Sequence, residues 1–169
     1  MSVMNFLAVE GTGLADVIPS RGAAFGDLFN DGKIDVVINC IDHTPVLLRN
    51  VNNDRNHWVG LLLIGGPKSP RDAVGSTVYL TAGGQRQRGD VMSGGSFMSS
   101  NDFRQHFGLG ESTTVDKVEI RWPDGVKETY TLPGVDRYFA IEEGNGLVPS
   151  VYDAIAQQRL RVGTSHAGK

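Results

Sequence analysis

Apolar residues alternate with polar residues along several short stretches of this chain, and this alternation predicts β-strands. The clearest stretch is 117–122, KVEIRW, where every second residue is apolar and the others are charged. A period of two places one side of a strand in a core and the other in water. The sequence PDG at 123–125 favours a turn, and an apolar return over 126–132 completes a predicted hairpin.

Other strands are predicted by short apolar runs that end at glycine, proline or polar residues. These runs cover residues 34–40, 45–50, 57–64 and 137–143; residues 77–81 alternate, and the turn AGG at 82–84 leads from them into a further predicted strand over 85–92. The first two flank the sequence IDHT and predict a second hairpin. Short strands separated by turns, in a chain with 22 glycines, are typical of an all-β protein. We therefore expect an antiparallel β-sandwich or a barrel-like body.

The two ends of the chain depart from the strand pattern. Residues 1–20 show little periodicity, and we expect them to form an extended arm on the body. Residues 150–160, SVYDAIAQQRL, place apolar residues near helical spacing after a serine that suits an N-cap, so we expect a short C-terminal helix. This helix either packs on the body or docks onto another protein.

An acidic turn, residues 27–35, lies between the arm and the first predicted strand. Asp27, Asp31 and Asp35 recur at every fourth position, and Gly32 can adopt the positive φ that a tight turn requires. Carboxylates that converge on a tight turn suit a hard cation such as Ca²⁺. The turn is therefore a candidate metal site.

The acidic turn departs from the EF-hand pattern at two ligand positions. Phe29 occupies the third loop position and Ile38 the twelfth, so a side-chain oxygen and a bidentate carboxylate are both absent. A predicted strand follows the turn, whereas an EF-hand continues into a helix. The alternative to a metal site is a turn whose aspartates accept hydrogen bonds from their own backbone.

The acidic turn and the strand after it resemble the FG-GAP or VCBS-type repeat of β-propeller blades, whose loops bind calcium. The resemblance implies that Asp27, Asp31, Asp35 and the carbonyl of Lys33 bind the ion. Because Phe29 replaces one acidic ligand, the site would be weak, with a Kd of about 0.1–1 mM or higher. A propeller needs about four blades or more. We therefore expect only a propeller-blade-like hairpin, over residues 21–53.

The second half of the chain resembles the ASPIC/UnbV domain. The motifs that carry the resemblance are HW at 57–58, SPRDAVG at 69–75, VYLTAGG at 78–84, HFGLG at 106–110, VEIRWPDG at 118–125 and YFAIEEG at 138–144. It implies a β domain over 54–145, followed by the helix and tail at 146–169. In this family the domain follows FG-GAP repeats in secreted or surface proteins, and no catalytic residues are established. The resemblance thus implies an extracytoplasmic location, periplasmic or secreted.

Charge and composition narrow the classes of partner. The net charge is −3 with both signs interspersed, and no basic block along the sequence indicates nucleic-acid binding. No apolar run is long enough to span a membrane, and the first residues lack the regions of a signal peptide. The single cysteine, Cys40, excludes an intrachain disulfide and is expected to be buried.

The sequence offers no candidate catalytic group. The serines of SGGS at 93–96 do not fit the Gly-x-Ser-x-Gly motif, and the four histidines lack metal-binding spacing. We expect His57 and His106 to lie at strand ends and to bond to backbone groups. Trp58 and Trp122 fall at apolar strand positions, so we expect both in the core.

These observations predict a non-enzymatic, extracytoplasmic module that binds another protein, as an accessory or stabilising subunit of a larger assembly. The alternative is a small-ligand module that binds calcium or carbohydrate. Apart from calcium, no cofactor is expected.

Overall fold

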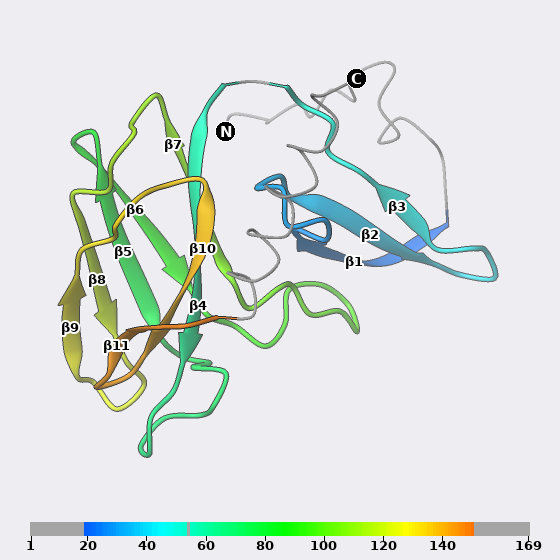
Figure 1. The fold of residues 1–169 in the computed structure, drawn as a ribbon. Coiled ribbons are helices and arrows are strands. Elements are labelled where there is room, and N and C mark those ends of the chain that lie inside the picture. The colour runs from blue at the N-terminus through cyan, green and yellow to red at the C-terminus, as the bar shows by residue number, and fades with distance from the viewer. Residues whose placement is uncertain (1–18, 54, 151–169) are drawn as a thin grey trace, which may run out of the picture.

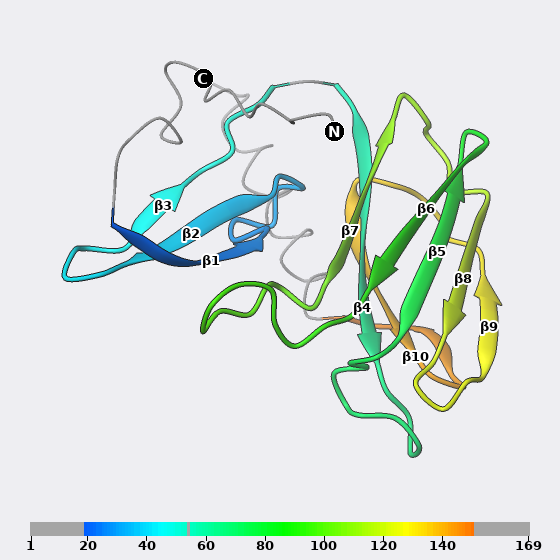
Figure 2. The same ribbon diagram turned by 180° about the vertical axis from the view of Figure 1, so that it is seen from behind.

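The computed structural model describes residues 19–53 and 55–150, and every regular element in these ranges is a β-strand. Figures 1 and 2 show one small sheet beside two larger sheets that face each other. The all-β prediction is confirmed. The predicted C-terminal helix and nearly all of the N-terminal arm lie outside the described residues. Within the described ranges, no helix is long and apolar enough to cross a membrane.

The small sheet, here called the N-terminal sheet, has the strand order β1-β2-β3. Its strands are β1 (Ser20–Gly26), β2 (Asp35–Cys40) and β3 (Val46–Leu48). The antiparallel pair β2–β3 confirms the predicted hairpin. Strand β1 was not predicted, because its sequence SRGAAFG is rich in small residues and lacks a clear alternation.

A second sheet, the β4 sheet, has the order β11-β10-β4-β7. Its strands are β4 (His57–Ile64), β7 (Gln105–Gly110), β10 (Arg137–Glu142) and β11 (Gly146–Val148). The expectation of a purely antiparallel body is wrong for one pair, because β4 and β10 run parallel. Strand β11 pairs with β10, so the body continues past the predicted boundary at residue 145.

The third sheet, the β5 sheet, has the order β6-β5-β8-β9. Its strands are β5 (Thr77–Ala82), β6 (Gln85–Asp90), β8 (Lys117–Arg121) and β9 (Lys127–Tyr130). All neighbours in this sheet are antiparallel, as predicted. The turn between β8 and β9 contains Gly125 with φ of 92°, a conformation that favours glycine.

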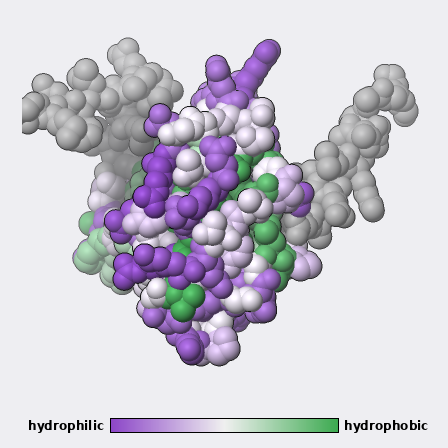
Figure 3. Space-filling model, turned by 90° about the vertical axis from the view of Figure 1, so that its left-hand side faces the viewer, coloured by the Kyte–Doolittle hydropathy of each residue, from purple (hydrophilic) through white to green (hydrophobic). Residues whose placement is uncertain are grey.

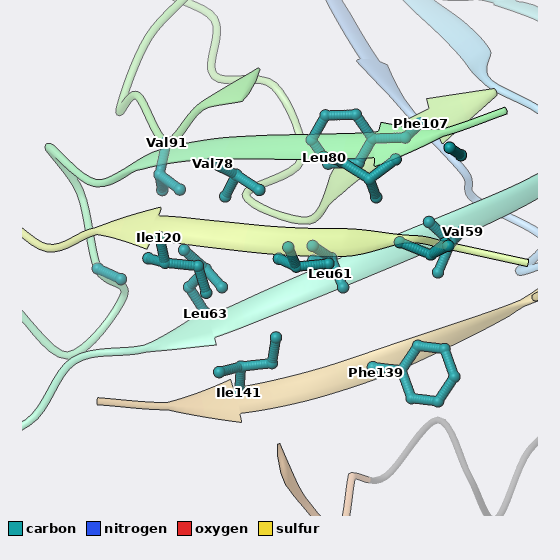
Figure 4. Close-up of a cluster of buried hydrophobic side chains, with 14 of the residues drawn as sticks. Val59, Leu61, Leu63, Val78, Leu80, Val91, Phe107, Ile120, Phe139 and Ile141 are labelled. Carbon is teal, nitrogen blue, oxygen red and sulfur yellow. The ribbon is translucent and has the colours of Figure 1, made fainter. Parts of the chain in front are cut away.

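The β4 and β5 sheets pack face to face on one hydrophobic core, which confirms the predicted sandwich. Figure 4 shows Leu61 and Leu63 of β4 near Val78 and Leu80 of β5, and each of these side chains is at most 2% exposed. Burial of one such side chain stabilises a fold by about 1.5–3 kcal/mol. Trp122 lies in this core, as predicted. Trp58 does not, and its position leads to the candidate site.

Candidate functional site

The acidic turn connects β1 to β2, and its own backbone surrounds the Asp27 carboxylate. Asp27 Oδ1 accepts a hydrogen bond from the backbone N of Asp31 at 3.0 Å, and Oδ2 accepts one from the backbone N of Gly32 at 2.8 Å. Gly32 has φ of 84°, which confirms the predicted left-handed residue. Asp27 is only 1% exposed. These bonds are the ones expected for a turn held by its aspartates.

Asp35 fixes the other end of the turn and is also 1% exposed. Its Oδ2 accepts a hydrogen bond from the backbone N of Leu28 at 3.2 Å, and its Oδ1 accepts one from the backbone N of Asn50 at 2.9 Å. Asp35 therefore joins the turn to the segment that follows β3. Asp31 accepts a hydrogen bond from the backbone N of Lys33 at 3.2 Å and lies 3.6 Å from Arg49.

The predicted calcium ligands lie in one turn, but their carboxylates do not form a metal-binding group. All four carboxylate oxygens of Asp27 and Asp35 already accept backbone N–H groups. Within residues 19–53 and 55–150, no group of three or more His, Cys, Asp or Glu side chains could hold a metal ion. These bonds hold the turn without an ion, as the alternative of backbone-bonded aspartates expects. Calcium binding by Asp27, Asp31, Lys33 and Asp35 stays a prediction from sequence.

An aromatic cluster on the outer face of the β4 sheet lies under the acidic turn. It consists of Trp58, His106 and Tyr138, from three neighbouring strands. The Trp58 ring stacks on His106 with centroids 5.3 Å apart, and meets Tyr138 edge-on at 5.0 Å. Gly60 lies beside this cluster, and glycine is required there because a Cβ would come within 2.0 Å of the Tyr138 ring. The expectation that Trp58 belongs to the core is wrong, since it packs on the other face of its sheet.

Each ring of the cluster contacts the acidic turn. The Tyr138 hydroxyl donates a hydrogen bond to Asp27 Oδ2 at 2.8 Å, and His106 Nε2 donates one to the Gly32 carbonyl at 2.8 Å. A Cβ on Gly32 would lie 2.1 Å from the Trp58 ring. The turn therefore fits onto the cluster only with glycine at this position.

Burial sets the protonation of two members of the cluster. Desolvation lowers the pKa of His106 from its ordinary 6.5, which favours the neutral ring. Desolvation and the hydrogen bond to Asp27 raise the pKa of Tyr138, so its hydroxyl keeps the proton that it donates. The His106 ring and the Tyr138 hydroxyl are thus both neutral where they contact the acidic turn.

Arg104 also connects the aromatic cluster to the acidic turn, and its side chain is 9% exposed. Its guanidinium lies 4.3 Å from the centre of the Tyr138 ring and donates to the Asp27 carbonyl at 2.7 Å. It also donates to Asp102 at 2.7 Å and to Asn30. A planar guanidinium can stack on a ring and donate from its edge at the same time, whereas a lysine ammonium has no planar group to stack.

The segment between β6 and β7 covers the free edge of β1, and both ribbon views show it extending beneath the N-terminal sheet (Figures 1 and 2). The backbone N of Asp102 donates to the Phe25 carbonyl at 2.9 Å, and the backbone N of Phe25 donates to Asn101 at 3.1 Å. The backbone N of Ala23 donates to the Ser96 hydroxyl at 3.3 Å. An exposed strand edge can pair with another chain, and this cover blocks the β1 edge.

The two histidines predicted to bond to backbone behave differently. His106 bonds to a carbonyl, as predicted. His57 instead bonds through Nδ1 to the Asp136 carboxylate at 2.7 Å, so the prediction is wrong there. The Asp136 carboxylate also accepts a hydrogen bond from the backbone N of Trp58, and the backbone N of Asp136 donates one to the Trp58 carbonyl. It therefore fixes the start of β4.

Two open cavities flank the acidic turn. The smaller, of about 230 Å³, is lined by Asp27, Arg104 and Tyr138 among others. The larger, of about 500 Å³, is bordered by the amides of Asn50 and Asn56 and by Arg55 and Trp58. The larger cavity has room for a small polar ligand.

Sequence patterns did not identify Trp58, Arg104 and Tyr138 as residues of this site. The only signal in the sequence was a weak alternation with a period of two. Trp58 and Gly60 are two positions apart, and so are Arg104, His106 and Gly108. Such alternation shows that residues share a face, but not which segment covers that face.

Residues 66–148 match the family model described as ASPIC and UnbV. The match runs from the turn after β4 through β11 and supports the resemblance found in the second half of the sequence. It includes Arg104, His106 and Tyr138, whereas the acidic turn lies outside it. No match was found among curated proteins. The FG-GAP resemblance of residues 21–53 stays a prediction.

Proposed function

We propose that the chain is a non-enzymatic, extracytoplasmic protein-interaction module whose N-terminal sheet contacts a partner. In this role it serves as an accessory or stabilising subunit of a larger assembly. The sandwich acts as a rigid platform, and the aromatic cluster holds the N-terminal sheet in place on it. The ASPIC and UnbV match supports the extracytoplasmic part, because proteins with this domain are expected outside the cytoplasm.

The observation that carries this proposal is where the exposed apolar side chains lie. Among the described residues, nine of the eleven large hydrophobic side chains that are exposed belong to the N-terminal sheet, its connections or the segment covering β1. They are Phe25, Leu28, Val37, Ile41, Leu47, Val51, Met92, Phe97 and Met98. Exposed apolar groups that gather in one region favour a protein contact.

A row that contains two of these side chains crosses the N-terminal sheet. Ala24 of β1 lies opposite Val37 of β2, which in turn lies opposite Leu47 of β3. Val37 is 36% exposed and Leu47 is 49% exposed. This row belongs to no part of the sandwich core, and Val37 and Leu47 are more exposed than the apolar residues on the opposite face of β2 and β3. We infer that a partner with an apolar surface covers it.

The test compares two double variants as baits in a gentle extract of the source cells. Val37→Lys with Leu47→Lys places two charges in the row, whereas Val126→Lys with Leu147→Lys does so on the sandwich. Val126 and Leu147 are 47% and 42% exposed, so the control changes similarly exposed residues. We expect the first variant to lose the partner retained by the wild type, with affinity for the purified partner reduced by about tenfold or more.

Unchanged melting temperatures of both variants would show that folding is intact. Equal retention of the partner by the wild type and by the Val37→Lys, Leu47→Lys variant would contradict the proposal. Equal loss by both variants would also contradict it, because the N-terminal sheet would then have no special role.

A small-ligand module is the second candidate, and the larger cavity beside the acidic turn favours it. Amide side chains and a guanidinium at a concave site suit the hydroxyl groups of a small neutral saccharide. A panel of saccharides tested by thermal shift should then raise the melting temperature of the wild type. The Arg55→Gln variant should show a smaller shift, and a panel without any shift would exclude this candidate.

A further inference from the structure

The outer face of the β5 sheet gathers basic side chains from three strands. Because Val78, Leu80, Val118 and Ile120 point into the core, the residues between them point outward. The basic side chains on this surface, here called the basic face, are Arg86, Arg88, Lys117, Arg121 and Lys127. All five are exposed. Figure 3 shows that this side of the molecule is mainly hydrophilic.

Only two acidic residues share the basic face, and basic neighbours pair with both. Asp90 lies 3.0 Å from Arg88, and Glu119 lies 3.4 Å from Arg86 and 3.0 Å from Lys117. Five basic and two acidic side chains leave three net positive charges on this face, although the whole chain carries −3. The basic face therefore attracts anions although the net charge of the whole chain is negative.

The excess charge is concentrated at Arg121 and Lys127. These two residues lie directly opposite each other on β8 and β9. Neither takes part in an ion pair within residues 19–53 and 55–150. Like charges in this position destabilise a strand pair, so the arrangement is unfavourable for the fold alone. An anion bound between the two side chains would relieve the repulsion.

Hydroxyl groups lie between the basic side chains. Thr81 sits between Arg86 and Lys117 in the strand register, and Thr77 lies beside Arg121. Tyr79 and Thr129 lie on either side of Glu119. The Thr77 hydroxyl donates to Asp90 at 2.8 Å, so the face offers its cationic donors together with the hydroxyl groups of Tyr79, Thr81 and Thr129.

We propose that the basic face binds an anionic polysaccharide. A polymer with both acidic groups and sugar hydroxyls matches the alternating cations and hydroxyl side chains. Single-stranded nucleic acid fits less well, because such binding uses free aromatic rings and the Tyr79 ring has the Arg86 guanidinium over it at 4.1 Å. An anionic membrane also fits less well, because the strands place no exposed aliphatic side chain on this face. This surface is separate from the N-terminal sheet, so the inference does not depend on the proposed function.

The test measures binding of the full chain to heparin and to polygalacturonate at about 50 mM salt, where charge interactions extend beyond 10 Å. Dextran serves as the neutral probe. We expect binding to at least one anionic polymer and none to dextran. The Arg121→Gln, Lys127→Gln variant should bind about tenfold more weakly. The Lys68→Gln, Arg71→Gln variant makes the same charge change on the turn after β4 and should bind like the wild type.

Three outcomes would overturn this inference. The first is the absence of binding to both anionic polymers. The second is an equal loss in both double variants, which would show that net charge alone decides binding. The third is tighter binding to single-stranded DNA or to phosphatidylglycerol vesicles than to either polymer, which would assign the face to a different class of partner.

Discussion

The Tyr138 hydroxyl donates a hydrogen bond to Asp27 across 111 positions of sequence, at 2.8 Å. This bond connects β10 of the sandwich to the first turn of the N-terminal sheet. Because it ends on a buried carboxylate, it contributes more than a bond between neutral groups. The two parts of the molecule are therefore coupled through a side chain that the sequence suggested as a metal ligand.

Replacing Tyr138 with phenylalanine should destabilise the protein by about 1.5–3 kcal/mol, because a charged acceptor loses a buried donor. The ring remains and can still pack against Trp58. The free energy of unfolding in urea measures the effect. Tyr79→Phe, on the basic face, is the control and should change stability by less than about 0.5 kcal/mol. Equal losses in the two variants would contradict a special role of this bond.

Gly32→Ala should displace the acidic turn from the aromatic cluster, because the new Cβ would lie 2.1 Å from the Trp58 ring. Gly125→Ala is a matched control: its φ of 92° is close to that of Gly32, and no atom lies within 4 Å of a Cβ there. Both variants strain the backbone, but only Gly32→Ala adds a clash. We expect it to lower stability by about 1–3 kcal/mol more than the control. Similar melting temperatures for both variants would show that the turn does not press on Trp58.

Stability should fall as the pH falls below about 6.5, and His106 should account for part of the loss. Burial lowers the pKa of His106 in the folded protein, so the unfolded chain binds the proton more readily. The contribution is complete above the unfolded pKa and is lost as the pH drops from 6.5 toward the folded value. Unfolding of the wild type and of His106→Gln at pH 7.5 and 5.5 measures it.

The His106→Gln variant should show a smaller difference in stability between the two pH values. Other titrating groups are present in both proteins, so the comparison isolates the His106 ring. An identical pH dependence in the two proteins would contradict the assignment.

Millimolar calcium should leave the melting temperature unchanged relative to a chelator, because backbone N–H groups hold the carboxylates of Asp27 and Asp35 in place without an ion. An ion that binds only the folded state stabilises it by RT ln(1 + [L]/Kd). A rise in melting temperature that Asp31→Asn abolishes would instead establish the calcium site implied by the FG-GAP resemblance.

Local patterns in the sequence predict the strands well where one face is apolar and the other charged. The stretch 117–122 is such a case, and the continuous apolar run 57–64 was equally clear because glycine and proline follow it; both became strands at nearly the predicted bounds. Strands β1, β7 and β11 were not predicted, because they are short or because small residues and glycines stand where polar residues would mark the alternation. Alternation depends only on residues that are close in sequence. Strand prediction from it therefore fails where packing against a distant segment decides the structure.

The candidate site could be predicted only in part for the same reason. The positions of the aspartates and Gly32 indicated a tight turn, and the alternative of backbone-bonded aspartates describes its geometry. Trp58, Arg104 and Tyr138 reach this turn only through the pairing of β4 with β7 and β10. The basic face likewise depends on register: Arg121 and Lys127 become direct neighbours only when β8 pairs with β9.

The parallel pairing of β4 with β10 also constrains the order in which the protein can fold during synthesis. Strand β4 ends at Ile64, and its parallel neighbour begins at Arg137. The ribosome must therefore make most of the chain before the centre of the β4 sheet can close. Until then Trp58 and the acidic turn cannot contact Tyr138, and the edge of β4 that later pairs with β10 can pair with a non-native strand. A nascent chain that stops before β10 would be a substrate for chaperones and proteases rather than a smaller working module.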